Sequence, residues 1–395
     1  MSELNYLEKL LAGAEVEWKE LGEVCRFING KAYKKPELLD QGKYPVLRVG
    51  NFFTNDNWYY SDLELHEDKY CDDGDLLYAW SASFGPRIWE GGKVIYHYHI
   101  WKVIPKIEIV SKKYLFYLLD WDTEALKAEH GTGSTMMHVG KGAIEKRVVP
   151  IPPLAVQNKV VQILDTFTTL TAELTAELLA REKQYAYYLR QLLTFNVEHV
   201  EWKTLEKVSN IFDSLHQTPK YTENGLNMIR VTNIKGGLLD LTETLKVSDE
   251  TFKIFTKRYA PQKFDLVMSR VGSYGNVSIV PLDHSVCMGQ NTVVIHPLIN
   301  KKFLYYVLSS EDVKTFIEKN VAGGSQKTLS LKVIKLIPIP IPNEKEQQRI
   351  VNILDKFDTL TTSLTEGLPR EIELRQQQYE YYRELLLSFP KPEDV

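Results

Sequence analysis

Two long stretches of the chain carry apolar residues at three- and four-residue spacing. The first follows the run PIPP at Pro150 and reaches Phe195, and the second follows PIPN at Pro340 and reaches Phe389. Proline is tolerated before a helix and in its first turn but not inside it, so each proline run marks a helix start. One apolar stripe on a long helix is the coiled-coil pattern, and two such helices can bury their stripes against each other. The sequence therefore predicts a pair of long antiparallel helices.

The residues expected to pack between these two helices are Ile163, Phe167, Leu170, Leu174, Tyr185, Tyr188, Ile353, Phe357, Leu360, Leu364, Tyr379 and Tyr382. The two stretches differ in length: Asp165 and Asp355 are 190 residues apart, whereas Phe195 and Phe389 are 194 residues apart. The additional residues lie around Gly367–Pro369. They amount to about one helical turn, so the stripe can stay in phase while Pro369 kinks or interrupts the helix.

The rest of the chain repeats in the same order. The matching segments are EWKELGEV at Glu17 with EWKTLEKV at Glu201, PVLRVGNF at Pro45 with NMIRVTNI at Asn227, DLLYAWSASFG at Asp75 with DLVMSRVGSYG at Asp265, and KYLFYLL at Lys113 with KFLYYVL at Lys302. We interpret these matches as one tandem duplication that relates the halves by a pseudo-twofold axis. Residues 6–11 resemble the last turns of the long helices, which suggests a cyclic arrangement. A chance amphipathic helix is the alternative.

Each repeated block mixes short β-prone runs, bounded by Gly, Asn and Asp turns, with one helix. A block of about 130 residues is large enough for its own core. We therefore predict an α+β protein with two globular α+β domains separated by a pair of long antiparallel coiled-coil helices. The predicted boundaries are a short N-terminal helix at 1–15, a first domain at 16–149, a first long helix at 150–197, a second domain at 198–339, and a second long helix at 340–390 with an interruption near Gly367–Pro369.

Composition fits a globular protein of two or three domains, with 395 residues, 44% hydrophobic and 25% charged. The formal charge of −4 hides opposite local signs, because residues 16–150 sum to about −2 and residues 201–343 to about +5. No window reaches eighteen apolar residues and the N-terminus does not resemble a secretory signal, so we expect a cytoplasmic protein. Three scattered cysteines argue against a disulfide framework.

Motifs of catalysis are not found in the expected form. The only Pro-Pro pair, Pro152–Pro153, belongs to a helix start and not to the N/D-P-P-Y/F motif of an amino-methyltransferase. Gly140–Gly142 lacks the spacing of a phosphate-binding loop, and Glu17–Lys19 lacks the upstream Pro-Asp of a nuclease motif. His97 and His99 have no third ligand at a useful spacing, so we predict no metal site.

Both blocks instead interleave basic, amide, hydroxyl and aromatic side chains on segments bounded by turns. Arg reads guanine, Asn and Gln read adenine, and hydroxyl groups and Lys hold phosphate, so this chemistry suits duplex DNA. Solvated loops are the alternative interpretation. The residues predicted to bind DNA are Lys31, Lys34, Lys35, Arg48, Asn51, Ser81, Ser83, Arg87, Lys220, Arg230, Asn233, Ser269, Arg270, Ser273, Tyr274, Asn276, Gln290, Asn291, Ser325, Gln326 and Lys327.

The whole chain resembles the specificity (S) subunit of type I restriction-modification systems. The resemblance rests on both EWK openings, the doubled PIP-x-x-x-x-Q-x-x-[IV]-[VI]-x-[IL]-L-D helix starts, and the doubled ends QYAYYLRQLLTF and QYEYYRELLLSF. It implies that each block is a target recognition domain that reads one half of a bipartite DNA sequence, while the helices set the unread spacer. The block interiors match only in outline, so no base-contacting residue is carried over.

The resemblance also implies that this chain is not an enzyme and holds no cofactor. Catalysis would lie in partner subunits: modification subunits that carry S-adenosylmethionine and methylate adenine, and restriction subunits that use ATP and Mg to move and cut DNA. The expected partners are double-stranded DNA and these subunits, with no membrane. Two alternatives stay open: a self-contained methyltransferase or nuclease with fused recognition domains, and a coiled-coil scaffold without DNA contact.

Overall fold

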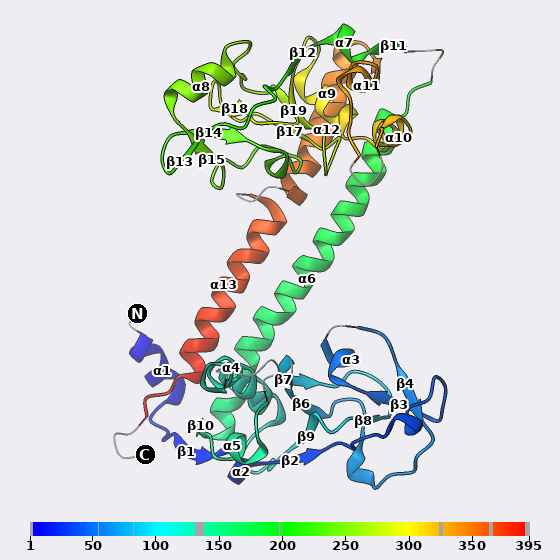
Figure 1. Ribbon diagram of the computed structural model, residues 1–395. Coiled ribbons are helices and arrows are strands. Elements are labelled where there is room, and N and C mark those ends of the chain that lie inside the picture. The colour runs from blue at the N-terminus through cyan, green and yellow to red at the C-terminus, as the bar shows by residue number, and fades with distance from the viewer. Residues whose placement is uncertain are drawn as a thin grey trace. The chain divides into compact units, whose positions relative to one another are not determined.

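The computed structural model describes residues 3–53, 55–81, 83–130, 138–196, 198, 200–323, 327–362 and 366–391. The chain divides into two compact units (Figure 1). The first unit comprises Met1–Ala172 with Leu374–Val395, and the second comprises Glu173–Glu373. Each unit therefore joins one repeated block to segments of the long helices. The boundaries predicted between domain and helix stay a prediction, because the compact units include both.

The first unit contains two four-stranded sheets and one two-stranded ladder. Its elements are α1 (Glu3–Leu11), β1 (Glu17–Glu20), α2 (Leu21–Val24), β2 (Cys25–Asn29), η1 (Lys35–Glu37), β3 (Tyr44–Leu47), α3 (Val49–Phe53), β4 (Tyr59–Ser61), η2 (Glu67–Lys69), β5 (Tyr70–Cys71), β6 (Leu76–Ser81), β7 (Ser83–Ile88), β8 (Val94–Tyr96), β9 (Ile100–Pro105), α4 (Lys112–His130), α5 (Lys141–Glu145), β10 (Val148–Ile151), the first part of α6 (Leu154–Leu193) and the later part of α13 (Gly367–Leu387). The sheet orders are β2-β9-β6-β7 and β4-β3-β8-β5, and β1 pairs with β10.

The second unit repeats this organisation. Its elements are the later part of α6, β11 (Glu201–Thr204), α7 (Leu205–Val208), β12 (Ser209–Asp213), β13 (Tyr221–Thr222), β14 (Leu226–Ile229), η3 (Val231–Asn233), β15 (Leu245–Val247), α8 (Asp249–Thr256), β16 (Leu266–Ser269), β17 (Val277–Ile279), β18 (Val286–Met288), β19 (Thr292–Pro297), α9 (Lys301–Leu308), α10 (Glu311–Asn320), α11 (Leu331–Lys335), β20 (Pro338–Ile341), α12 (Glu344–Thr362) and the start of α13. The sheet orders are β12-β19-β16-β17 and β13-β15-β14-β18, and β11 pairs with β20.

Strand order makes the predicted duplication visible. The sheet β2-β9-β6-β7 corresponds to β12-β19-β16-β17, and β4-β3-β8 corresponds to β15-β14-β18. In both cases one pair is parallel, β3 with β8 and β14 with β18. The fourth strand is added at opposite edges, since β5 pairs with β8 whereas β13 pairs with β15. The predicted fold class is confirmed, and the repeats diverge at the sheet periphery.

The motifs that open and close each block pair with each other. In the first unit Trp18 of β1 lies opposite Pro150 of β10, and in the second unit Trp202 of β11 lies opposite Pro340 of β20. Proline cannot donate to a ladder, so it is tolerated here because each ladder has only two strands. This pairing ties the start of each domain to its end, directly before a long helix begins.

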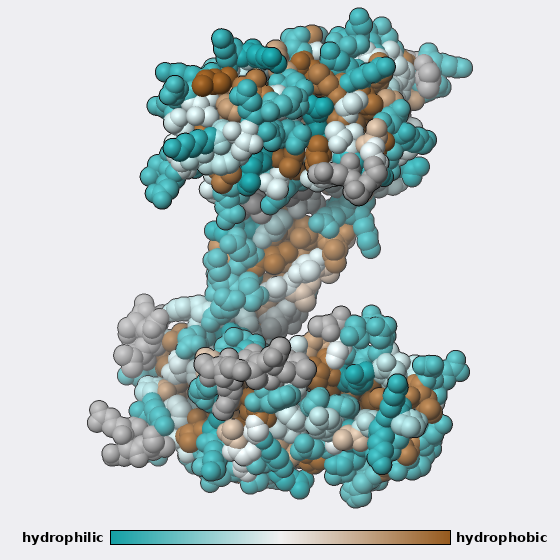
Figure 2. All heavy atoms as spheres, viewed as in Figure 1, coloured by the Kyte–Doolittle hydropathy of each residue, from teal (hydrophilic) through white to brown (hydrophobic). Residues whose placement is uncertain are grey.

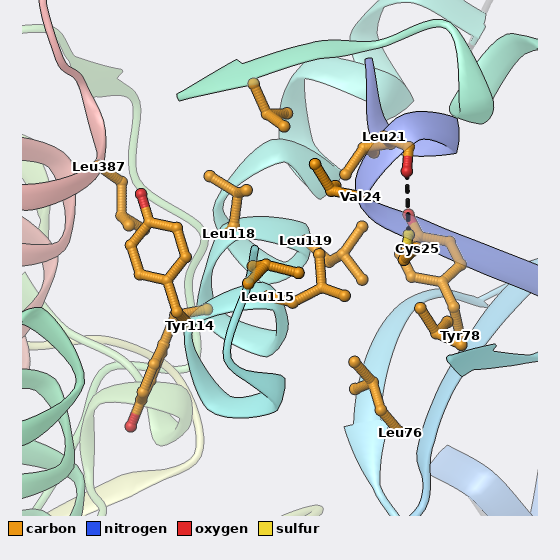
Figure 3. Packing of buried hydrophobic residues seen from close by; sticks show 14 of the residues in the cluster. Leu21, Val24, Cys25, Leu76, Tyr78, Tyr114, Leu115, Leu118, Leu119 and Leu387 are labelled. Carbon is orange, nitrogen blue, oxygen red and sulfur yellow. Dashed lines mark hydrogen bonds between the residues drawn. The ribbon is translucent and has the colours of Figure 1, made fainter. Parts of the chain in front are cut away.

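Each domain core includes the C-terminal end of a long helix. Figure 3 shows Leu387 of α13 beside Tyr114 of α4, with Leu118 of the same helix nearby. All three side chains are fully buried. In the second unit Leu193, the last residue of α6, belongs to the core cluster of that domain. Burying a leucine side chain contributes roughly 1.5–3 kcal/mol, so these helix ends hold domain and helix together.

The beginning of each long helix buries a second apolar stripe that the sequence analysis did not separate. Val160 and Leu164 of α6 are fully buried in the first core, as Ile350 and Leu354 of α12 are in the second. The predicted stripe residues beside them are half-buried. They are Ile163, Leu170, Leu174, Ile353, Leu360 and Tyr379, while Leu364 lies outside the described residues.

Aromatic rings make the contacts between the long helices inside each unit. In the first unit Phe167 of α6 stacks on Tyr382 of α13, with ring centroids 5.2 Å apart. In the second unit Phe357 of α12 lies 6.3 Å from the ring of Tyr185 and 5.3 Å from that of Tyr188, both on α6. The start of one long helix therefore packs against the end of the other, as an antiparallel pair requires.

The second long helix is interrupted. Helix α12 ends at Thr362, and α13 begins at Gly367, whose φ is +81°. A Cβ on Gly367 would lie 2.4 Å from the carbonyl oxygen of Thr359 and 2.8 Å from that of Leu360. In an uninterrupted helix these carbonyls accept from amides four residues later, so Gly367 returns to the place of the next turn. The helix is thus interrupted close to the position that the sequence predicts.

Two further predictions concern membrane and thiols. Searching the described part of the chain finds no helix that combines the length and the apolar character of a membrane span. Cys25, Cys71 and Cys287 are buried free thiols. Burial raises the pKa of each to about 12, so they stay protonated and unreactive in the folded protein.

Candidate nucleic-acid interface

A buried glutamine fastens the start of each long helix to its domain. The amide oxygen of Gln157 accepts from the backbone of Ser111 at 2.8 Å, and that of Gln347 accepts from the backbone of Asn300 at 3.3 Å. Each glutamine also donates, at 2.8 Å, to the carbonyl of the proline five residues earlier. A buried amide with both ends bonded is satisfied, and it fixes the direction in which the helix leaves the domain.

A partly buried aspartate makes a second fastening about two turns further along. Asp165 of α6 accepts from the hydroxyl group of Tyr117 at 2.7 Å, and Asp355 of α12 accepts from that of Tyr306 at 2.6 Å. Each aspartate also pairs with the lysine four residues before that tyrosine. Burial raises the pKa of both tyrosines, so their hydroxyl groups stay protonated and can donate. The same bonds recur in both units and hold α4 and α9 against the long helices.

The first group of predicted DNA-binding residues lies beside η1. The ammonium group of Lys31 lies 3.3 Å from the carboxylate of Glu37 and 5.6 Å from the ring centroid of Tyr33. Lys34 and Lys35 have exposed side chains. Lys31 is therefore engaged within the domain, while Lys34 and Lys35 face solvent.

Arg48 and Arg230 occupy equivalent turns in the two domains. The side-chain oxygen of Asn51 accepts a hydrogen bond from the backbone amide of Arg48 at 3.3 Å, and that of Asn233 accepts one from the backbone amide of Arg230 at 2.9 Å. Both arginines are exposed, and the guanidinium group of Arg48 lies 5.1 Å from the ring centroid of Tyr59. The asparagines shape the turns, so the arginines are the side chains that these turns present.

The hairpin of β6 and β7 carries three predicted residues. Ser81 and Ser83 lie opposite each other in the register, and Ser81 is only 1% exposed. Arg87 is exposed and lies 5.6 Å from the ring centroid of Phe52. Of the three, Arg87 has the freest access to a ligand.

Ser269 and Arg270 are held inside the second domain. Ser269 is fully buried, and its hydroxyl group donates to the carbonyl of Ser273. The guanidinium group of Arg270 bonds the carboxylate of Asp213 at 2.7 Å and the carbonyl of Leu329 at 3.1 Å. Only 12% of the Arg270 side chain is exposed. Both residues therefore organise the turn between β16 and β17 in this structure.

The remaining predicted residues of the second domain lie nearer the surface. Asn276 is exposed and donates to the carbonyl of Ile234 at 3.2 Å, and Gln290 is exposed and donates to the hydroxyl group of Thr218 at 3.2 Å. Lys220, Ser273 and Lys327 are exposed, Tyr274 and Asn291 are half-buried, and Ser325 and Gln326 lie outside the described residues. Hydrophilic residues predominate on the visible face of each unit (Figure 2).

His97 and His99 join a cluster of rings in the first domain. Their centroids are 4.9 Å apart, and His99 lies 5.0 Å from Trp80. Burial lowers the pKa of His97 to about 4, and burial with the nearby His138 lowers that of His99, so both rings are neutral near pH 7. Within the described ranges, no three His, Cys, Asp or Glu side chains are grouped to hold a metal ion.

Sequence reasoning missed the positioning role of Gln157, Gln347, Asp165 and Asp355. A signal was present, because all four occupy fixed places in the doubled helix-start motif. Their partners come from segments about 50 residues earlier, which the motif does not show. The sequence analysis also did not identify Trp80 and His138 as residues near the surface that could contact a ligand.

Two α+β domains, each fastened by the same side chains to long helices and each presenting basic and polar groups, define a two-domain recognition protein. The family described as "Type I restriction modification DNA specificity domain" matches residues 14–181 and again 199–374. The specificity subunit of the Escherichia coli type I restriction enzyme EcoR124I/EcoR124II is 35% identical over the whole of both chains. A putative specificity subunit from Haemophilus influenzae is 33% identical over 98% of each chain.

Solved structures agree on the fold. The S subunit of a type I restriction-modification system from M. genitalium matches with a TM-score of 0.58 at 15% identity, covering 96% of this chain and 98% of that one. Because the family model matches both halves and two relatives are more than 30% identical over nearly the whole chain, the chain belongs to the type I restriction-modification DNA-specificity family. It is a specificity subunit and not itself the catalyst, which sets aside the self-contained enzyme.

Proposed function

We propose that each domain reads one half of a bipartite sequence in duplex DNA and that the paired helices set the length of the unread spacer. The observation that carries this proposal is the repeated fastening of each domain to a long helix through Gln157 and Asp165, and through Gln347 and Asp355. A domain held by several partly buried hydrogen bonds keeps its orientation on the helix. Two such domains on one chain can demand two half-sites at a fixed separation.

Phosphate contacts in this proposal come from exposed basic side chains. Arg48 and Arg230 hold equivalent positions, and Lys34 and Lys35 add charge in the first domain. The block at residues 201–343 carries a net charge of about +5. Such contacts position a protein on the duplex and weaken as salt rises.

Partners supply the chemistry. The chain would assemble with modification subunits that use S-adenosylmethionine to methylate adenine, and with restriction subunits that use ATP and Mg. A protein that assembles with these subunits on chromosomal DNA would act in the cytoplasm. A scaffold without DNA contact is the competing function, and it predicts no DNA retained at low salt.

The test is binding of the full chain, together with its modification subunits, to duplexes that carry two half-sites. Inserting one base pair into the spacer moves one half-site by about 3.4 Å and rotates it by about a tenth of a turn. We expect such an insertion to abolish specific binding, and an insertion outside both half-sites, as the matched control, to leave it unchanged. Binding that tolerates any spacer length would refute the proposal that the helices set the spacer. No binding at low salt would favour a scaffold without DNA contact.

A further inference from the structure

The two domains share a backbone hydrogen-bond pattern at one edge of their central sheets. The amide of Trp80 donates to the carbonyl of His99 at 3.1 Å, and the amide of Arg270 donates to the carbonyl of Asn291 at 2.8 Å. In both domains this bond joins the strand before the hairpin to the residue that precedes β9 or β19. Trp80 is therefore equivalent to Arg270, and His99 to Asn291.

A second bond fixes the equivalence of a neighbouring segment. The amide of Val139 donates to the carbonyl of Trp80 at 3.1 Å, and the amide of Leu329 donates to the carbonyl of Arg270 at 2.8 Å. Val139 and Leu329 are both buried. We call the residues around these bonds the strand-end edge. Its equivalent pairs are Trp80 with Arg270, Tyr98 with Gln290, His99 with Asn291, and His138 with Thr328.

In the first domain the strand-end edge is aromatic. The rings of Tyr98 and His99 lie 3.9 Å apart, and those of His99 and His138 lie 6.1 Å apart. The indole nitrogen of Trp80 donates to the carbonyl of Tyr98 at 2.8 Å, which fixes the turn. His138 is exposed and the other three are half-buried. This edge offers ring faces and the neutral imidazole of His99.

In the second domain the same edge carries amides, a hydroxyl group and a guanidinium group. The guanidinium group of Arg270 is held by its hydrogen bond to Asp213, whereas Gln290 and Thr328 are exposed. Asn291 has a φ of +63°, a conformation that asparagine tolerates better than most residues. The chemical class changes at every position of the edge while the backbone bonds stay the same.

The turn that carries Arg48 and Arg230 behaves in the opposite way. The amide of His97 donates to the carbonyl of the residue before Arg48 at 2.9 Å, and the amide of Gly289 donates to that before Arg230 at 2.8 Å. At this turn the backbone hydrogen bond and the arginine side chain are both the same in the two domains. A contact to phosphate carries no sequence information, so the same side chain can make it in both domains, whereas contacts to different bases call for different side chains.

Resting on the proposed function, we propose that the strand-end edge of each domain selects the bases of its half-site. Gln290 and Asn291 have the amides that pair with the adenine edge. Tyr98 and His99 offer ring faces for apolar contact, and the imidazole of His99 can form hydrogen bonds. Arg48 and Arg230 contact phosphate and add affinity without sequence preference. The two half-sites therefore differ because the edges differ.

Selection of binding sites from randomised duplexes tests this proposal, using the full chain with its modification subunits. Gln290→Ala should relax the base preference about tenfold at one position of one half-site, and Tyr98→Ala should relax the other half-site only. Gln290→Glu should move the preferred base toward cytosine, whose amino group a carboxylate accepts. Arg48→Ala and Arg230→Ala are the controls and should weaken binding to all sequences without changing preferences.

The outcomes distinguish failure of the base-selection proposal from failure of the proposed function. Unchanged preferences in Gln290→Glu and Tyr98→Ala, or changes spread over both half-sites, overturn the assignment of the strand-end edge. A thermal melting temperature equal to that of the unsubstituted chain shows that a variant is folded, and Gln290→Glu preserves the side-chain shape where Gln290→Ala does not. If the unsubstituted complex selects no bipartite sequence at all, the proposed function itself has failed.

Discussion

Removing the hydroxyl group of Tyr306 tests whether the aspartate of α12 fastens the second domain to its helix. The hydroxyl group donates to Asp355 at 2.6 Å, and Tyr306 is 1% exposed. Tyr306→Phe keeps the ring and its packing and deletes only the donor. Tyr117→Phe makes the same change against Asp165 in the first unit, so each variant is the matched control of the other.

The size of the effect follows from the geometry. A hydrogen bond to a charged group contributes about 1.5–3 kcal/mol to stability. Asp355 keeps its ion pair with Lys302 at 2.5 Å, and its side chain is 32% exposed, so water can replace part of the lost bond. We therefore expect the lower end, about 1.5 kcal/mol. That value corresponds to roughly tenfold faster exchange of amide hydrogens protected by this contact.

Hydrogen–deuterium exchange of the full chain, read by mass spectrometry, resolves the two units separately. Tyr306→Phe should speed exchange in α9 and leave α4 unchanged, and Tyr117→Phe should do the reverse. A double-mutant cycle with Asp355→Ala isolates the pair, because the effects of Tyr306→Phe and Asp355→Ala should then fail to add. Additive effects, or faster exchange in both units from one substitution, would refute the fastening.

Three further predictions concern other parts of the chain. Gly367→Ala should destabilise by about 1–3 kcal/mol in thermal melting followed by circular dichroism, and by more than Gly272→Ala, which has a φ of +70° but open space around its Cβ; equal effects would contradict the close approach. Lowering the pH from about 6.5 toward 4 should weaken the fold, because the unfolded chain binds a proton that folded His97, with its pKa near 4, does not; urea unfolding should show a smaller pH dependence for His97→Gln. The three buried thiols should resist iodoacetamide at pH 8 until urea unfolds the chain, and rapid labelling of the native protein would show that they are accessible.

The helices and the duplication could be predicted because their signals are local or repeated. Proline runs at Pro150 and Pro340 mark helix starts through chain stereochemistry alone, and the duplicated segments give the same domain twice. The stripe that includes Phe167 and Phe357 predicted that the helices pack together, because apolar periodicity follows the helix repeat. The antiparallel orientation followed from the second block, which must carry the chain from the end of the first helix to the start of the second. These features depend on residues close in sequence.

The site could be predicted only in outline, because its contacts join distant segments. Arg270 looks like a DNA-reading residue in sequence, yet Asp213, 57 residues earlier, holds it inside the domain. Ser81 and Ser269 suit phosphate by chemistry but are buried at the ends of their strands. The equivalence of Tyr98 with Gln290 shares no sequence similarity at all. It becomes visible only through backbone bonds that strand pairing creates.

The interruption before Gly367 means that the number of residues in the second long helix does not by itself give the length of that helix. Gly367 lies against the carbonyl groups of Thr359 and Leu360, so α13 restarts beside the last turn of α12. We expect residues added between α12 and α13 to disturb the following helix less than residues added inside a helix. A residue inserted within the continuous α6 would instead move the helical residues after it by about 1.5 Å along the axis and rotate them by about 100°. We therefore expect changes in the length of α6 to alter the separation of the two half-sites more than changes at the interruption before Gly367.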